Sequence, residues 1–396
     1  MRGIGDQDLF VCRFALDDPS LASMWTRLQG VGGVPSPFLT WEWVGSLAET
    51  PELCRNVQVL VCYERDHVAG LLPLQWSSGS GRLREVRIAG HWLAPDHLDV
   101  VSSPGHEHAV AAAVLTHLVE ARDWELLELS GLAECGALAA ALRRLRPPRF
   151  AYRVKEVLQL PWVELAGKDA AEVLPRRNLR QQVGRGRRVA ERSGGGFTTV
   201  REPASVGPLL EEMMRLHNMR WGSASTVFAT AARRDFHRRA VRRLAAADLM
   251  RFYRLRVGEI DAAVLYALRL DRRLYYYSMG MTPEAGLSPG RTVLGQAILS
   301  AAEEGLEEFD LLRGEHDFKL RFATGVRSNL HVQVARVTPR SGLAVGRWAS
   351  RAAVQRARAK LASARTNGAT QRDKIADRGP AADEQPQQSS AGTGGY

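Results

Sequence analysis

Residues 274–322, LYYYSMGMTPEAGLSPGRTVLGQAILSAAEEGLEEFDLLRGEHDFKLRF, decide the fold class of this 396-residue chain. The aromatic run at residues 274–279 is typical of a strand. A Ser-Pro-Gly turn at residues 288–290 begins a helix whose apolar residues recur at helical spacing, and Gly305 ends it. Residues 308–312 form a second buried strand before a polar turn and another helix. This order of elements predicts an α/β unit.

The start of the predicted helix is a candidate anion site. Its first backbone N–H groups have no partner within the helix, and with the helix dipole they suit a phosphate or pyrophosphate. Gly290 would let a ligand approach the backbone closely, and Arg291 adds a full positive charge. An ordinary crossover turn also explains the glycine and the proline, so this pattern leaves both interpretations open.

Charged residues crowd together after the second predicted strand. Asp310, Arg313, Glu315, His316 and Lys319 lie within ten residues of one another. In open α/β sheets, ligands sit outside the carboxyl ends of the strands. The sequence therefore predicts the reactive centre at this strand end.

The motifs YYYSMGM, SPGRT, EFDLLRG and DFKLRF in this segment resemble the second half of a GNAT-type N-acyltransferase. The segment is most similar to the CelD/BcsL-like, or cellulose-biosynthesis-type, branch, which is related in fold to the Fem peptidyltransferases. The resemblance covers residues 150–338 well and residues 8–150 more loosely. It implies an α/β fold of tandem GNAT-like domains with mixed central sheets, and an acyltransferase that forms no acyl-enzyme.

The resemblance implies catalytic roles for the charged cluster. Asp310 is the candidate general base or amine-orienting group, and His316 could act as the base instead. Lys319 is the candidate contact for the oxyanion or the donor. Arg313 either binds an anionic substrate or pairs with Asp310. A purely structural ion pair between Asp310 and Arg313 remains an open alternative.

The resemblance also implies where an acyl carrier binds. The strand at Tyr275–Met279 would present backbone N–H groups to the carrier arm, and the helix start would take the pyrophosphate of acetyl-CoA or another acyl-CoA; no metal is implied. The predicted carrier-binding residues are Tyr277, Ser278, Met279, Ser288, Gly290, Arg291 and Thr292. Tyr276 and Tyr277 have opposite-facing side chains, so we expect one to line the cleft and the other to lie in the core.

Three classes of function stay open. The lead is an acyl-CoA-dependent N-acyltransferase that acts on an amino sugar, a polysaccharide precursor or a secondary metabolite. The loop at residues 284–290 departs from the usual GNAT pyrophosphate pattern, and Phe318-Lys319 resembles an element of the Fem proteins, so an aminoacyl-tRNA-dependent transferase is the second class. A non-catalytic binding or scaffold protein of a biosynthetic complex is the third.

A basic segment precedes the second half of the chain. Residues 176–192 hold seven arginines and one acid, with a thin apolar stripe that predicts a helix. Such a run is usually a solvated face, but arginine also suits bidentate phosphate contacts. We predict that Arg176, Arg180 and Arg187, together with Phe318, contact an anionic part of a substrate.

The Ser-Pro-Gly turn occurs twice, at residues 103–105 and 288–290, each time followed by a helix and a strand. This recurrence predicts a degenerate repeat of one α/β fold. The predicted divisions are an N-terminal degenerate GNAT-like domain, a C-terminal catalytic GNAT-like domain, a basic helix and a disordered tail, at residues 1–150, 151–338, 339–365 and 366–396.

Composition sets wider bounds. The net charge of +11 favours polyanionic partners such as CoA, tRNA or acidic glycans, although an arginine-rich codon bias explains part of it. The four cysteines form no metal-ligand pattern and read as core residues of a reducing compartment. The absence of a long apolar run predicts a soluble, cytoplasmic protein without a transmembrane segment. We expect a small-molecule or glycan-precursor amine as partner, possible tRNA and no DNA; the oligomeric state stays open.

Overall fold

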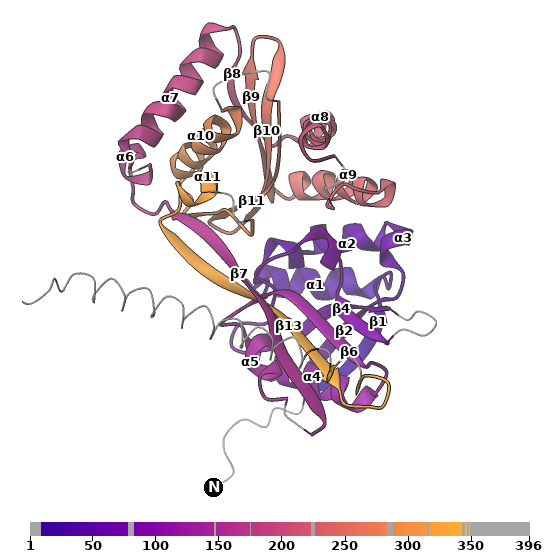
Figure 1. Ribbon diagram of the computed structural model, residues 1–396. Helices are drawn as coiled ribbons and strands as arrows, with labels where there is room; N and C mark the ends of the chain where they lie inside the picture. Colours follow the sequence, from indigo (N-terminus) through magenta and orange to yellow (C-terminus); the bar gives the residue numbers. More distant parts are fainter. Residues whose placement is uncertain are drawn as a thin grey trace, which may run out of the picture. The chain divides into compact units, whose positions relative to one another are not determined.

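The computed structural model describes residues 9–77, 83–145, 148–174, 176–222, 226–282, 288–314 and 317–342, with residues 345, 346 and 348. The described residues up to Ser341 form one compact unit, shown in Figure 1. The candidate base His316, the loop at residues 283–287, and nearly all of the predicted basic helix and tail lie outside the described residues.

The described chain alternates strands and helices. The strands are β1 (Leu9–Ala15), β2 (Val57–Glu64), β3 (His67–Ser77), β4 (Glu85–Ile88), β5 (Val101–Ser102), β6 (Leu126–Ala133), β7 (Phe150–Glu164), β8 (Gly196–Val200), β9 (Met250–Val257), β10 (Ile260–Leu270), β11 (Arg273–Met281), β12 (Glu308–Asp310) and β13 (Gly325–Arg336). The helices are α1 (Ser20–Gly30), α2 (Trp41–Ala48), α3 (Pro51–Cys54), α4 (Glu107–Ala121), α5 (Ala137–Leu142), α6 (Ala170–Val173), α7 (Arg177–Arg192), α8 (Pro203–Trp221), α9 (Ala231–Ala246), α10 (Pro289–Glu303) and α11 (Asp317–Leu320), with 3-10 turns η1 (Pro37–Leu39) and η2 (His91–Leu93).

One mixed sheet of 13 strands runs through the unit, in the order β1-β2-β3-β4-β6-β13-β7-β12-β11-β10-β9-β8, with β5 paired to β3. The two ends of this order mirror each other: β1, β2, β3, β4 and β6 correspond to β8, β9, β10, β11 and β12. The last strands of the two copies, β7 and β13, are exchanged, since β13 pairs with β6 and β7 pairs with β12. The fold therefore contains two α/β units with the same strand order, as the repeated turn predicts. The domain boundary at residue 150 stays a prediction.

The helices cover both faces of the sheet. In the C-terminal half, α7 and α10 lie on one face, and α8 and α9 lie on the other (Figure 1). The core under α8 and α9 continues into the N-terminal half, where Trp43 of α2 packs edge-on against Phe236 of α9 and Tyr277 of β11. A second core lies under α7 and α10. The two halves share the first core, which explains why they form one unit.

The two copies differ beside their central strands. In the N-terminal half, the segment after β4 fills the position next to β6, because Leu98 bridges to Leu132 and β5 pairs with β3. In the C-terminal half, β11 pairs with β12 only over Arg273–Tyr275. On that side, no described residue pairs as a strand with the rest of β11. Of the two copies, only the C-terminal one leaves its central strand open among the described residues.

The predicted basic helix over residues 176–192 is present as α7, and the predicted strand–helix–strand unit is present as β11–α10–β12. Of the cysteines, Cys62 is buried, but Cys135 is exposed and so does not fit the predicted core role. Across the described residues, none of the helices combines the length and the apolar character that crossing a membrane requires.

Candidate active site

The site starts from an irregularity in β11. Tyr266 of β10 pairs with Ser278, but the next residue, Ala267, pairs with Tyr276, so Tyr277 is the extra residue of a β-bulge. The bulge lies where β11 loses its pairing to β12. Residues 276–281 of β11 therefore have no described strand on this side, and the predicted carrier contact along this strand stays a prediction.

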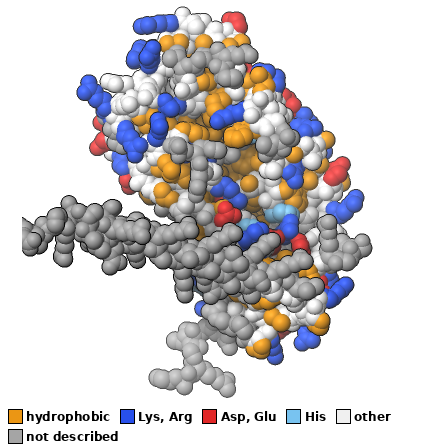
Figure 2. Space-filling view, in the orientation of Figure 1, with side chains coloured by type: hydrophobic (Ala, Val, Ile, Leu, Met, Phe, Trp, Pro, Cys, Tyr) orange, Lys and Arg blue, Asp and Glu red, His pale blue; other side chains and the backbone are white. Residues whose placement is uncertain are grey.

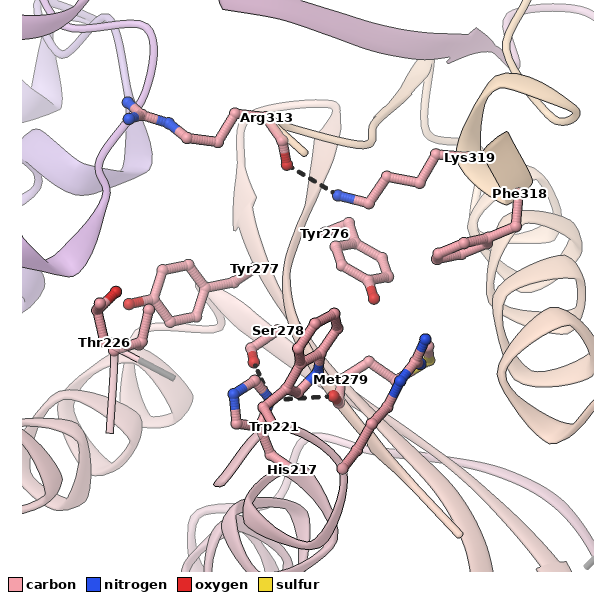
Figure 3. A pocket seen from close by; sticks show the side chains of 12 residues that line it. His217, Trp221, Thr226, Tyr276, Tyr277, Ser278, Met279, Arg313, Phe318 and Lys319 are labelled. Carbon is pink, nitrogen blue, oxygen red and sulfur yellow. Dashed lines mark hydrogen bonds between the residues drawn. The ribbon is translucent and has the colours of Figure 1, made fainter. Parts of the chain in front are cut away.

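A cavity of about 240 Å³ opens beside this edge, between β11, the end of α8 and α11. Figure 3 shows its lining: Tyr276, Tyr277, Ser278 and Met279 come from β11, His217 and Trp221 from α8, and Phe318 and Lys319 from α11. Arg220, Thr226, Val227 and Arg313 complete it. Six of the predicted site residues meet here: Tyr277, Ser278, Met279, Arg313, Phe318 and Lys319. We refer to it as the central cavity.

Lys319 places a buried ammonium group in the central cavity. Its side chain is 3% exposed, and Nζ donates to the carbonyl oxygens of Leu311 at 2.8 Å and Arg313 at 3.0 Å. Nζ also lies 4.3 Å from the centre of the Tyr276 ring (Figure 3). Burial lowers the pKa of Lys319 to about 8, opposed by the nearby Asp96 and Asp310 carboxylates.

Asp310, at the end of β12, is fully buried and does not line the central cavity. Its Oδ1 accepts a hydrogen bond from the backbone N–H of Leu312 at 2.8 Å. Its Oδ2 is 2.9 Å from Nε2 of His97 and 3.7 Å from Nη1 of Arg327. Neither Oδ2 nor Nε2 makes a well-aligned hydrogen bond to a described residue. Asp310 therefore faces His97, and direct contact with an acceptor in the central cavity, as predicted, does not fit this geometry.

Arg313 joins the two halves of the chain. Its Nε lies 3.0 Å and its Nη2 2.7 Å from the Asp96 carboxylate, and Nη2 also donates to the Pro95 carbonyl at 2.6 Å. Asp96 is fully buried and also accepts from Nδ2 of Asn329 at 3.1 Å. The predicted pair between Arg313 and Asp310 is absent from the described contacts, because the N-terminal half supplies the partner carboxylate instead.

His217 lines the central cavity and was not predicted from the sequence. Its Nδ1 is 3.2 Å from the Met279 carbonyl and 3.4 Å from Oγ of Ser278, as the dashed lines in Figure 3 mark. Burial lowers the pKa of His217, so the ring is neutral near pH 7. With Nδ1–H donated to the carbonyl, Nε2 is the basic nitrogen of this tautomer.

A second cavity of about 220 Å³ lies at the start of α10, lined by Met279, Met281, Ser288, Gly290, Arg291 and Phe318. It adjoins the central cavity, since Met279 and Phe318 line both. Ser288 is exposed and has φ of 52°, in the left-handed region. This places three of the predicted phosphate contacts, Ser288, Gly290 and Arg291, at one cavity.

Two residues predicted at the helix start have packing roles: Gly290 in addition to lining this cavity, and Thr292 in place of lining it. A Cβ on Gly290 would lie 2.7 Å from Sδ of Met281 and 2.8 Å from Cε of Met279, so the glycine makes room for methionines. Thr292 is 2% exposed, and a Cβ on Gly186 of α7 would lie 2.1 Å from its Oγ1. The hydroxyl of Thr292 therefore faces α7 and not the cavity.

Tyr276 and Tyr277 face opposite sides of β11, as predicted. Tyr276 belongs to the core under α10. The Tyr277 ring packs in the other core, where its hydroxyl donates to the Leu93 carbonyl at 3.1 Å and lies 3.4 Å from Nε2 of His237. Both rings border the central cavity. The hydroxyl of Tyr277 is thus engaged in the interface between the halves.

The predicted anion-binding arginines lie apart from the central cavity. Arg176 is exposed at the N-cap position of α7. Arg180 donates from Nη1 to the Leu174 carbonyl at 2.7 Å, and Arg187 pairs with Glu191 at 2.7 Å. Arg180 and Arg187 both line a third cavity, between α7 and α10.

The residues that sequence reasoning missed are His97, Asp96, Asn329 and His217. His97 and Asp96 belong to an irregular segment of the N-terminal half that carries no local motif. No signal in the sequence links them to residues more than 200 positions away, such as Arg313. Within the described ranges, no group of three or more His, Cys, Asp or Glu side chains is placed to hold a metal ion.

Comparison with known proteins agrees with this geometry. Residues 177–320 match the family model of the acetyltransferase (GNAT) domain. A search of curated proteins found no match to the chain. The match to the GNAT domain model covers residues 177–320 alone, and the CelD/BcsL-like branch stays a prediction.

Solved structures share the fold over most of the chain. The C-terminal domain of a putative lysylphosphatidylglycerol synthetase from Agrobacterium fabrum has a TM-score of 0.52 at 13% identity, covering 82% of this chain and 93% of that one. FemX has a TM-score of 0.52 at 12% identity, covering 76% and 93%. L-PGS from Bacillus licheniformis has a TM-score of 0.51 at 12% identity, covering 83% and 96%. At these identities the likeness concerns the fold alone.

Proposed function

We propose that the protein is an N-acyltransferase that takes its acyl group from an acyl-CoA and transfers it directly to an amine. One observation carries the proposal: the open edge of β11 connects two adjoining cavities, one at the start of α10 and one around Lys319. A phosphate-bearing carrier held at the helix start would reach Lys319 along this edge. The matching GNAT domain over residues 177–320 supports the same reaction class.

Three residues in or near the central cavity have proposed roles in acyl transfer. The ammonium group of Lys319 has two of its three donors fixed by carbonyls, and the third is available for the oxyanion that forms when the amine attacks. Neutral His217 is the proposed proton acceptor for the attacking amine. The proposed role of Asp310 is to support the Lys319 charge from its buried position beside His97, without direct contact with the acceptor.

The cavity also constrains the acceptor. Its described lining holds Arg220, Arg313 and Lys319 but no carboxylate, and of these cations Arg313 is already paired with the buried Asp96. Arg220 and Lys319 would repel an acceptor whose only charge is its ammonium group. We propose an acceptor that carries an anionic group beside its amine, of the amino-sugar-phosphate or amino-acid kind.

The test pairs binding with transfer. Ser288→Asp puts a negative charge at the exposed residue before α10, and Ser288→Asn is its matched neutral control, since both residues tolerate positive φ. Acetyl-CoA binding by titration calorimetry should weaken at least about tenfold in Ser288→Asp alone. Release of the CoA thiol over a panel of amines should fall about 10²–10³-fold in Lys319→Met, the size of losing one oxyanion donor. Equal acetyl-CoA affinity in both Ser288 variants would refute the carrier site.

An aminoacyl-tRNA donor is the second candidate, favoured by the arginines of α7. The same calorimetry with charged tRNA separates the two donors. Binding of charged tRNA without binding of acetyl-CoA would replace the first proposal by the second.

A further inference from the structure

The groove between α7 and α10 is a separate cavity of about 500 Å³, within the range of small-ligand sites. Its lining combines apolar and charged side chains: Leu174, Arg180, Val183, Gly184, Arg187, Arg188, Glu191, Gln296 and Leu299. None of these residues lines the central cavity or the cavity at the start of α10. The groove is thus a third place where a ligand fits.

The arginines of α7 gather on the side of this groove. At about 100° per residue, Arg176, Arg177, Arg180, Arg187 and Arg188 fall within a sector of about 120° on the helix. The buried residues Leu179, Val183, Gly186 and Ala190 fall in an adjoining sector of about 60°. Figure 2 shows Lys and Arg side chains gathered at the upper left, over α7. The positive charge is therefore directed, not spread evenly around the helix.

These charges are only partly compensated. Arg187 pairs with Glu191, but both side chains are about half exposed, so the pair contributes little. Arg188 makes no hydrogen bond or ion pair with any residue that the structure describes. The groove therefore offers guanidinium donors to an anion, with only one carboxylate to oppose it.

The two glycines inside α7 differ in whether packing requires them. Gly186 is required by packing, because a Cβ there would lie 2.1 Å from Oγ1 of Thr292. Gly184 has no such need: the nearest atom to an added Cβ is Nη1 of Arg188, at 3.3 Å, on a flexible side chain. A glycine inside a helix costs about 1 kcal/mol relative to alanine. Packing does not explain Gly184, which leaves bare backbone in the floor of the groove.

We propose that the groove binds a small molecule through a phosphate monoester. The guanidinium groups of Arg187 and Arg188 hold the phosphate, since their planar forks match its oxygens. The apolar wall of Leu174, Val183 and Leu299 packs against the rest of the molecule. The 3′-phosphate of CoA and the phosphate of a separate ligand present the same chemistry. Only the first would make CoA bind more tightly than 3′-dephospho-CoA.

The test is direct binding to the full chain by titration calorimetry, with adenosine 3′,5′-bisphosphate, CoA and 3′-dephospho-CoA as probes. The groove variant is Arg187→Gln/Arg188→Gln. The matched control is Arg185→Gln/Arg192→Gln, which removes the same charge from the same helix outside the groove lining. The bisphosphate should bind the parent and the control alike and the groove variant at least about tenfold more weakly, as expected from losing charged hydrogen bonds.

The CoA probes then identify the source of the phosphate. If CoA binds at least about tenfold tighter than 3′-dephospho-CoA, and the groove variant abolishes the difference, the CoA 3′-phosphate occupies the groove. If the two bind equally while the bisphosphate still depends on the groove arginines, the ligand is a separate phosphorylated molecule. Both outcomes support the proposal.

Three outcomes would overturn the proposal. The first is no binding of the bisphosphate to the parent at millimolar concentration, and the second is an equal loss of bisphosphate affinity in the groove and control variants. The third is a single-stranded RNA oligonucleotide that binds more tightly than the bisphosphate and that both variants weaken equally. A second variant guards against misfolding. Gly184→Ala should melt at the same or a higher temperature yet bind the bisphosphate more weakly, and unchanged binding would contradict the role of Gly184. Since no readout involves transfer, a protein that transfers acyl groups but fails these tests refutes the groove alone.

Discussion

The buried ammonium group of Lys319 gives a quantitative prediction about pH and stability. Its side chain is 3% exposed, and burial lowers its pKa from 10.5 to about 8. A shift of this size means that keeping Lys319 charged costs the folded state about 3 kcal/mol at pH 7 relative to the unfolded chain. Between the two pKa values the unfolded chain binds more protons, so the contribution of Lys319 to stability rises with pH.

Lys319→Met isolates this contribution. The variant leaves the Leu311 and Arg313 carbonyls without their donor, which lowers its stability by about 1–3 kcal/mol per carbonyl, but this loss does not change with pH. From pH 7 to pH 9.5 the parent should therefore gain about 2 kcal/mol of unfolding free energy relative to the variant. The assay is urea unfolding of both proteins at the two pH values.

A matched control defines what would refute the reasoning. Lys155 is an exposed lysine that pairs with Glu128 at 2.9 Å and is not buried as Lys319 is, so Lys155→Met should show a much smaller pH-dependent difference. A relative gain below about 0.5 kcal/mol for Lys319, or a gain equal to that of the Lys155 control, would mean that the ammonium group is not desolvated in the fold. The proposed oxyanion role would then lose its physical basis.

Three further predictions concern packing, charge and acid stability. Gly186→Ala should destabilise the fold by about 1–3 kcal/mol, because the new methyl group would overlap the Thr292 hydroxyl; thermal melting checks this, and an unchanged melting temperature would contradict it. Asp96→Ala should cost about 3 kcal/mol in urea unfolding, since it leaves the partly buried Arg313 guanidinium without its carboxylate, and a loss below about 1 kcal/mol would show that solvent replaces the pair. Burial lowers the pKa of His237 to about 3, so below pH 6.5 the unfolded chain binds a proton that the folded chain does not. Between pH 7 and pH 4 the parent should therefore lose about 3 kcal/mol more unfolding free energy than His237→Phe. Urea unfolding of both proteins at the two pH values measures this.

Local patterns predicted the elements of the site well. The strand β11, the helix α10 and the basic helix α7 each carry a complete signal within a few residues, because helix hydrogen bonds and strand alternation are local properties. The same patterns placed Lys319 and the helix start at the ends of elements, whereas Phe318 was predicted from the resemblance to the Fem proteins. The bulge at Tyr277 has no comparable signal, because it is defined by the partner strand.

Local patterns failed wherever a partner lay far along the chain. Asp310 was predicted to contact the acceptor, but the burial that excludes this comes from His97 in the other half. Arg313 was predicted to bind either an anionic substrate or Asp310. Its partner in the structure is Asp96, which lies 217 residues away in the sequence. Thr292 was predicted to contact a carrier, and α7 covers it instead.

The sequence by itself determined the succession of strands and helices, the repeat marked by two Ser-Pro-Gly turns, and the residue types at the ends of β11 and β12. Only the tertiary structure decided which of these side chains share a cavity, and which carboxylate neutralises which cation. The physical reason is the exchange of β7 and β13. Because each last strand lies against the other copy, the charged groups of one half are buried by, and paired with, groups of the other.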